Sequence, residues 1–160
     1  MGKQKEVKTN AMRILDRMKI TYQTHTYECD EFVDGKQTAD LLGFPHEMMF
    51  KTLVTVSPDK NYFVFVLPID GELDLKKAAH EAAQKSLAMI HVKEINQITG
   101  YIRGGCTAIG MKKQYPVFID ASARTQEHII VSGGKIGAQI ELTPEDLAKA
   151  CSGVFCELTR

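Results

Sequence analysis

The residues best able to do chemistry gather in a glycine-rich stretch that runs from Gly100 to Pro116 and reads GYIRGGCTAIGMKKQYP. The adjacent Gly104 and Gly105 permit positive φ angles and let a ligand approach bare peptide N–H groups. Such N–H groups can hold an anion or a developing oxyanion. A glycine pair on its own is more typical of a tight turn between two strands, so this stretch needs support from the rest of the sequence.

Cys106 follows the glycine pair, where neighbouring N–H groups could favour a thiolate. A nucleophilic cysteine also needs a nearby base, and His25, His91 and His128 are equal candidates in the sequence. The hypothesis of a cysteine-dependent hydrolase therefore rests on Cys106 alone.

Lys51 is a second candidate, because it begins an apolar strand directly after Met48-Met49-Phe50. A lysine in this position either extends to solvent or marks a polar site at the end of the strand. Thr52 beside it would point to the opposite face of the strand. Both interpretations of Lys51 stay open at this point.

Motifs for metals and nucleotides are incomplete. The stretches HEMMF (46–50) and HEAAQ (80–84) each lack the second histidine of a zinc-binding H-E-x-x-H helix. The glycine clusters GGCTAIG and SGGKIGA do not have the spacing of a P-loop or a dinucleotide fingerprint. The four cysteines, at 29, 106, 151 and 156, form no C-x-x-C pair. We therefore expect neither a metal nor a cofactor.

Length and composition are those of an ordinary globular protein. With 160 residues, of which 44% are hydrophobic and 25% charged, we expect a single domain over 1–160. Lys and Arg total 20 and Asp and Glu total 20, which argues against a generally basic nucleic-acid surface. No apolar run reaches the roughly 20 residues of a membrane helix, and the N-terminus lacks the apolar core of a secretory signal. We expect a cytoplasmic protein without membrane contact.

Hydrophobic periodicity predicts an alternation of helices and strands. Thr9, Thr38, Asp74 and Thr143 are candidate caps for helices, and Gly43 is a candidate stop. A further short helix is expected at 46–49 and a helical turn at 94–99. Strands are expected at 20–27, 51–56, 62–67, 88–92, 117–120, 128–133, 139–142 and 154–158. The strands at 51–56 and 62–67 form a probable hairpin of almost wholly apolar residues, so the sheet should be covered on both faces. The fold class is α/β with α+β character and a mixed sheet.

Seven motifs occur in the order found in one known family. They are HTYE (25–28), FKTL (50–53), GELDLKKAA (71–79), GYIRGGCTAIGMKK (100–113), VFIDASA (117–123), VSGGKIGAQIEL (131–142) and PEDLAKA (144–150). On these motifs the chain resembles the YbaK/EbsC family of free-standing Cys-tRNA(Pro)/Cys-tRNA(Cys) deacylases, over about residues 9 to 158. That family is related to the editing domain of prolyl-tRNA synthetases.

The resemblance implies a mixed, mostly antiparallel, barrel-like sheet with flanking helices. It implies hydrolysis of the ester in mischarged tRNA, with Cys-tRNA(Pro) as the substrate of YbaK-type members. The partners implied are the 3′ CCA end of the tRNA and a prolyl-tRNA synthetase that recruits the enzyme. The substrate's own thiol would attack its carbonyl, so no protein nucleophile would be required.

The resemblance also assigns residues to the site. Lys51 would engage the terminal phosphate or adenosine, and the backbone of Gly104 and Gly105 would hold the ester carbonyl. The residues implied in substrate binding are Tyr27, Thr52, Thr107, Ser132, Gly133, Gly134 and Gln139.

The chain departs from the family at two places. Typical members read GGISP-x-G where this chain has Thr107-Ala108 in place of Ser-Pro, and they carry an aspartate where it has Gln139. A carboxylate can bind a substrate ammonium as an ion pair, whereas the amide of Gln139 offers only a dipole. The departures leave open another small amino acid as substrate, or a binding module of the same fold that does not hydrolyse.

Overall fold

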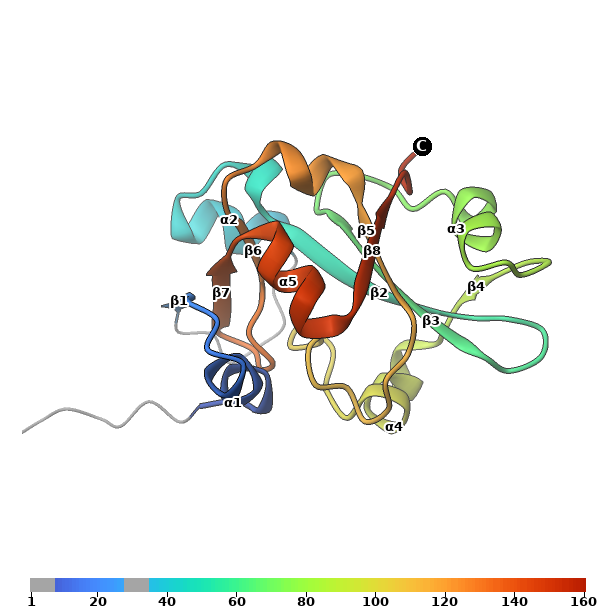
Figure 1. The fold of residues 1–160 in the computed structure, drawn as a ribbon, viewed down its shortest axis with the longest axis horizontal. Helices are drawn as coiled ribbons and strands as arrows, with labels where there is room; N and C mark the ends of the chain where they lie inside the picture. Colours follow the sequence, from blue (N-terminus) through green and yellow to red (C-terminus); the bar gives the residue numbers. More distant parts are fainter. Residues whose placement is uncertain (1–7, 28–34) are drawn as a thin grey trace, which may run out of the picture.

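The computed structural model describes residues 8–27 and 35–160, and it arranges helices around two β-sheets (Figure 1). The helices are α1 Asn10–Arg17, α2 Gly35–Leu42, α3 Leu75–Glu81, α4 Ile95–Thr99 and α5 Pro144–Cys151, with short 3₁₀ helices η1 His46–Met48, η2 Val92–Glu94 and η3 Ala121–Thr125. The strands are β1 Gln23–Thr26, β2 Phe50–Val56, β3 Tyr62–Pro68, β4 Ala88–Met89, β5 Val117–Asp120, β6 Ile129–Ser132, β7 Ala138–Leu142 and β8 Gly153–Cys156.

The two sheets have different strand orders. The smaller sheet is antiparallel with the order β1-β7-β6, and the larger is mixed with the order β4-β2-β3-β5-β8. A single parallel bridge between Met49 and Ile130 links them. The predicted mixed, mostly antiparallel arrangement is confirmed: among the described strand ladders β3–β5 and β5–β8 are parallel, and the other four are antiparallel. The description as barrel-like is loose, since the two sheets remain separate ladders in the described residues.

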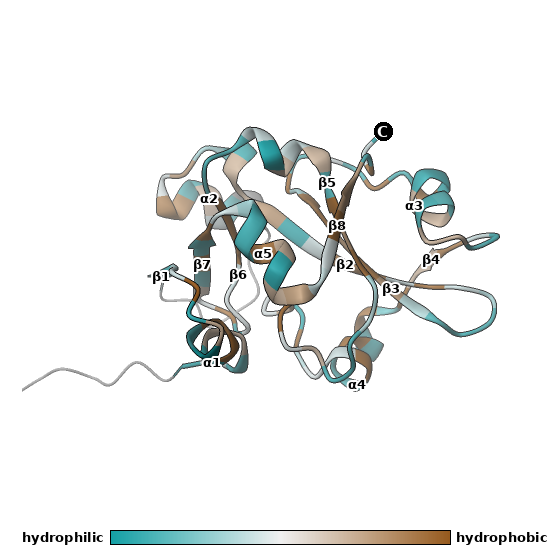
Figure 2. Cartoon of the chain, viewed as in Figure 1, coloured by the Kyte–Doolittle hydropathy of each residue, from teal (hydrophilic) through white to brown (hydrophobic). Residues whose placement is uncertain are grey.

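The predicted burial of the larger sheet on both faces is confirmed along β3. Val64 and Val66 pack into one apolar cluster, whereas Phe63, Phe65 and Leu67 pack into another beneath α3. The alternation follows from the pleat, which sends successive side chains to opposite faces. Figure 2 shows hydrophobic colours along β3 and β8 and hydrophilic residues on α3 and α5.

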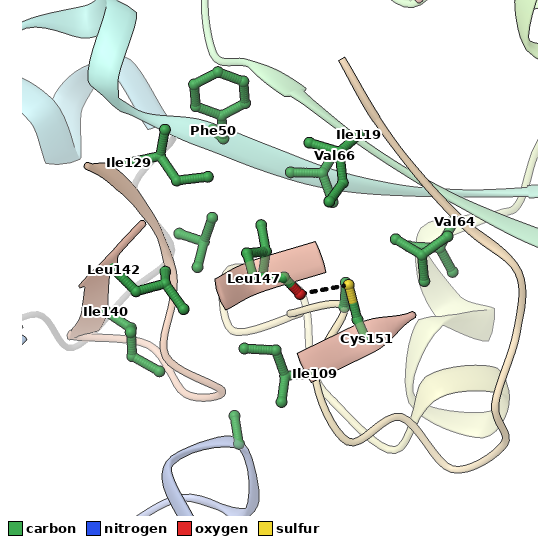
Figure 3. Packing of buried hydrophobic residues seen from close by; sticks show 14 of the residues in the cluster. Phe50, Val64, Val66, Ile109, Ile119, Ile129, Ile140, Leu142, Leu147 and Cys151 are labelled. Carbon is green, nitrogen blue, oxygen red and sulfur yellow. Dashed lines mark hydrogen bonds between the residues drawn. The ribbon is translucent and has the colours of Figure 1, made fainter. Parts of the chain in front are cut away.

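The larger cluster joins the two sheets to the helices. Figure 3 shows Val64, Val66 and Ile119 of the larger sheet facing Ile140 of the smaller sheet and Leu147 of α5. The Sγ atom of Cys151 lies 3.1 Å from the Leu147 carbonyl oxygen, to which it donates. This packing fixes the smaller sheet relative to the larger one, which is what places residues from both at one site.

Most of the helix signals predicted the correct boundaries. The side chains of Thr9, Asp74 and Thr143 each accept a hydrogen bond from the first turn of their helix. Gly43, with φ of +75°, follows the end of α2 as expected. The prediction that Thr38 caps α2 is wrong: the helix begins at Gly35, and Thr38 lies buried within it.

Two strands and one loop also differ from expectation. β1 is shorter than 20–27 because the Ile20 N–H donates to the Leu15 carbonyl and so belongs to the end of α1. β4 stops at Met89, because His91 already precedes η2. The stretch from Gly100 to Pro116 connects α4 to β5 rather than two strands, and Gly100 ends α4 with φ of +85°.

None of the helices in the described part of the chain has the length and the apolar run that a membrane crossing needs.

His46 ties α2 to the end of β3 through two carboxylates. Its Nε2 lies 2.9 Å from an Asp40 oxygen of α2, and its Nδ1 lies 3.1 Å from an Asp70 oxygen just after β3. Hydrogen bonds to Asp40 and then to Asp70 raise the pKa of His46 above its usual value. Both nitrogens can donate only when the ring is protonated.

We expect His46 to stabilise the fold at mildly acidic pH. Because its folded pKa is raised, the contribution is fully present below the usual pKa of about 6.5 and is lost as the pH rises through the folded pKa. Thermal unfolding of wild type and His46→Gln between about pH 5.5 and about pH 9 measures it. The difference in melting temperature should shrink toward high pH, and a difference that is constant with pH would contradict the assignment.

Candidate active site

A cavity of about 360 Å³ lies where the two sheets meet. Its walls come from β2, from the smaller sheet, from the loop after α4 and from the segment between β4 and α4. Six of the predicted site residues line it: Tyr27, Lys51, Thr52, Gly104, Ser132 and Gln139. A second hollow of about 380 Å³ lies beside α1 and contains none of them, so we take the first as the candidate site.

The smaller sheet places Ser132 and Gln139 side by side. Ser132 of β6 pairs with Gln139 of β7, which pairs in turn with His25 of β1. Cross-strand partners point to the same face of a sheet, so these polar side chains share one face. Tyr27 follows β1 and is held there by its N–H, which donates to the Gly137 carbonyl at 2.9 Å.

Two cationic side chains line the cavity. Lys51 is half-buried, and its Nζ donates to the Ile69 carbonyl at 3.3 Å. Arg103 comes from the loop after α4 and is exposed. Lys51 therefore lines the cavity near the beginning of β2, and its role in a polar site stays a prediction.

The structure separates the roles of the glycine pair. Gly104 has φ of +86° and lines the cavity. Gly105 is buried behind it, and its N–H donates to the Ile102 carbonyl at 2.9 Å. A Cβ at position 105 would lie 2.8 Å from the Cα of Lys135, so this glycine lets two loops pack closely. The carbonyl-binding role stays a prediction; of the two glycines only Gly104 lines the cavity, and the Gly105 N–H is already used in the turn.

The second glycine-rich loop, residues 133–138, contacts the beginning of α1. Gly133 donates to the Ala138 carbonyl at 2.8 Å, and its own carbonyl accepts from the Thr9 hydroxyl at 2.5 Å. Gly134 has φ of +102°, and a Cβ there would lie 3.2 Å from the Thr9 Cβ. Of the predicted residues in this loop only Ser132 lines the cavity, whereas Gly133 and Gly134 seat the beginning of α1.

The two family departures lie in different environments. Thr107 is fully buried beneath the loop, where its hydroxyl accepts from the Ile109 N–H at 3.4 Å, and it does not line the cavity. Gln139 is 7% exposed and does line it. The nearby carboxylate of Glu141 does not replace the missing charge, because it bonds His25 at 2.7 Å and His128 at 3.0 Å. Burial is the largest single influence on the pKa of Glu141 and raises it, but the hydrogen bonds and charges of His25 and His128 together outweigh burial, so the pKa is lowered.

Cys106 lines the cavity as a neutral thiol. Burial raises its pKa to about 11, and a hydrogen bond with the Thr99 side chain only partly opposes this. Neither His25 nor His128 is available as its base, since both bond Glu141, and His91 caps η2. None of the three histidines lines the cavity. The cysteine-dependent hydrolase hypothesis therefore has no geometric support in the described residues.

The sequence reasoning missed one wall of the cavity. It is apolar and is formed by Met89 at the end of β4 and by Ile90, Val92 and Ile95, which come after it. Met89 and Val92 are 43% and 54% exposed, so this wall also forms the rim. Arg103 was missed as well, although its position directly before Gly104 was a usable signal. Within residues 8–27 and 35–160, no group of three or more His, Cys, Asp or Glu side chains is arranged to hold a metal ion.

Comparison with known proteins identifies relatives along the whole chain. The family model of the aminoacyl-tRNA editing domain matches residues 31–150. EbsC of Enterococcus faecalis, whose name provisionally describes it as a Cys-tRNA(Pro)/Cys-tRNA(Cys) deacylase, is 43% identical over 161 residues, covering 99% of this chain and 98% of that protein. A proline–tRNA ligase of Shouchella clausii is 32% identical over 101 residues, which are 63% of this chain and 18% of the ligase.

A solved structure shows the same fold. A crystal structure described provisionally as a trans-editing enzyme for prolyl-tRNA synthetase has a TM-score of 0.80 to this chain, with 96% of this chain and 99% of that one covered. The two are 19% identical, so this likeness concerns the fold alone.

We expect Cys106 to react slowly with iodoacetamide at neutral pH, because only the thiolate is nucleophilic and the pKa is raised to about 11. Peptide mapping by mass spectrometry follows its alkylation separately from that of the other cysteines. The rate should still be rising tenfold per pH unit at about pH 9.5. A plateau below about pH 8.5 would show an activated thiol and contradict the assignment.

Proposed function

Because the chain belongs to the aminoacyl-tRNA editing domain family, we propose that it is a trans-editing deacylase that hydrolyses the ester of mischarged tRNA, with Cys-tRNA(Pro) as its first substrate. The family predicted from the sequence motifs is confirmed by these matches. The amino acid and the tRNA are inferred from the name of EbsC and are tested below.

One observation carries the proposal: in the part of the chain that the structure describes, the cavity combines two cations, the backbone of Gly104 and one thiol, that of Cys106, whose pKa burial raises to about 11. Lys51 and Arg103 suit the phosphate next to the terminal adenosine. The backbone of Gly104 suits an ester carbonyl whose oxygen becomes negative in the transition state. An aminoacyl ester is already activated, so positioning and charge stabilisation are sufficient help.

The substrate supplies the nucleophile in this mechanism. The cysteinyl sulfur forms a bond to its own carbonyl carbon, the ester C–O bond breaks, and the thiol proton passes to the released ribose oxygen. Water then opens the cyclic thioester to free cysteine. The chain's own residues hold the carbonyl and the phosphate in place, and Ser132 and Gln139 supply polar groups for the substrate ammonium.

A prolyl-tRNA synthetase is the proposed partner. The formal net charge of zero provides little general attraction for the tRNA body, so the protein would grip only the 3′ end. Recruitment by the synthetase would raise the effective concentration of the mischarged product. The similarity to part of a proline–tRNA ligase supports this choice.

We expect Lys51→Ala to lower kcat/KM for Cys-tRNA(Pro) on the order of a hundredfold, because a charge at the reacting end is lost. The measurement is deacylation of Cys-tRNA(Pro), Ala-tRNA(Pro) and a panel of other mischarged tRNAs. Lys149→Ala removes the same charge from the exposed face of α5 and should match wild type. If wild type hydrolyses none of the panel but binds a non-hydrolysable analogue, the chain is a binding module instead.

We expect Cys106→Ser to keep at least about a third of wild-type activity, because the residue lines the cavity without supplying a nucleophile. Circular dichroism and the melting temperature control for folding. Loss of activity in a folded Cys106→Ser protein would replace the substrate-thiol mechanism with one that uses a protein nucleophile.

A further inference from the structure

β2 presents its edge to the cavity rather than a face. Five consecutive residues, Phe50 to Val54, line the cavity. In a strand that offers one face, only alternate residues would do so, because successive side chains point to opposite sides. Consecutive lining therefore means that the cavity contains the backbone edge of the strand.

The hydrogen bonds of the β2–β3 hairpin show which backbone groups point into the cavity. The Ile69 N–H donates to the Met49 carbonyl, and the Ser57 N–H donates to the Asn61 carbonyl. In an antiparallel pair with this register, odd-numbered residues of β2 therefore bond β3 and even-numbered residues point away from it. The Ile90 N–H accordingly donates to the outward carbonyl of Val54 at 3.2 Å.

The outward edge is paired at both ends and open between them. β4 pairs with it at Thr55 and Val56, and the bridge from Met49 to Ile130 joins it to the smaller sheet. Among the described residues no strand pairs with the outward N–H and carbonyl of Thr52, which lie midway. The cavity of about 360 Å³ adjoins this opening.

We propose that these backbone groups of Thr52 bind the Watson–Crick edge of the terminal adenine of the substrate, an inference that rests on the proposed function. The N–H would donate to adenine N1, and the carbonyl would accept from the adenine 6-amino group. The N–H and carbonyl of one extended residue point the same way, and adenine offers an acceptor and a donor side by side. The base would lie in the plane of the sheet and replace the missing strand.

The surroundings of Thr52 favour a base over the aminoacyl group. The apolar wall of Met89, Ile90 and Val92 begins where β4 leaves β2, next to Val54. Adenine is the base next to the aminoacyl ester and has apolar faces and a polar edge, and bases commonly bind with their faces on apolar side chains. The aminoacyl group would then bind at the other walls of the cavity, beside Gly104, Ser132 and Gln139.

The test uses amide-linked, non-hydrolysable cysteinyl-adenosine and its base variants in calorimetry. Hypoxanthine reverses the donor and acceptor at these two positions, and 7-deazaadenine leaves both unchanged. We expect hypoxanthine to weaken binding about 10- to 100-fold and 7-deazaadenine to bind within about twofold, because an unmatched polar pair in a closed site is costly. Equal binding of all three probes overturns the inference.

A variant pair tests the protein side. Thr52→Pro removes the outward N–H, which β3 does not use, and proline is tolerated at such edge positions. Thr52→Val removes only the hydroxyl, so it should keep the discrimination between adenine and hypoxanthine that Thr52→Pro reduces. If Thr52→Pro does not fold, the base series with wild type decides alone.

The two proposals fail differently. Hydrolysis of mischarged tRNA together with equal binding, or no measurable binding, of all base variants overturns the adenine inference and leaves the proposed function standing. Absence of both hydrolysis and probe binding overturns the proposed function and the inference with it.

Discussion

Between Met49 and Val54, β2 changes its neighbour from the smaller sheet to β4, and within residues 8–27 and 35–160 no strand lies beside the backbone between these points. A buried backbone N–H or carbonyl must find a partner, so such a gap persists only where water or a ligand can enter. This gap beside β2 explains why the cavity lies between the two sheets. It also explains why consecutive residues of β2 line the cavity. The apolar clusters on both sides of β3 hold the larger sheet rigid, so the gap keeps its shape.

Close packing of two glycine loops closes the site from the opposite side. Gly105 lets the loop after α4 lie against the backbone of Lys135, and Gly134 leaves room for Thr9 at the beginning of α1. Side chains at these positions would push the loops apart, and Gly104 would then move away from the cavity. Gly105 and Gly134 thus act by having no side chain, and of the glycines in these two loops that the structure describes only Gly104 lines the cavity.

The sequence predicted the local structure well, because its signals are local. Capping by Thr9, Asp74 and Thr143 needs only residues within one turn, and the hairpin of β2 and β3 needs only an apolar pattern and a turn. The site was predicted in part: Lys51, Gly104 and Gln139 meet at the cavity, whereas Gly105, Thr107 and Gly133 lie behind it. Which glycine faces a ligand depends on contacts between loops that are distant in sequence. The apolar wall after β4 was missed because a short exposed apolar run has no distinctive period.

The protonated thiol of Cys106 has a consequence for life under oxidative stress. Peroxides attack thiolates. A thiol whose pKa is about 11 has almost no thiolate fraction at neutral pH. A cavity that keeps its cysteine in the unreactive form would continue to work while activated cysteines elsewhere are being oxidised.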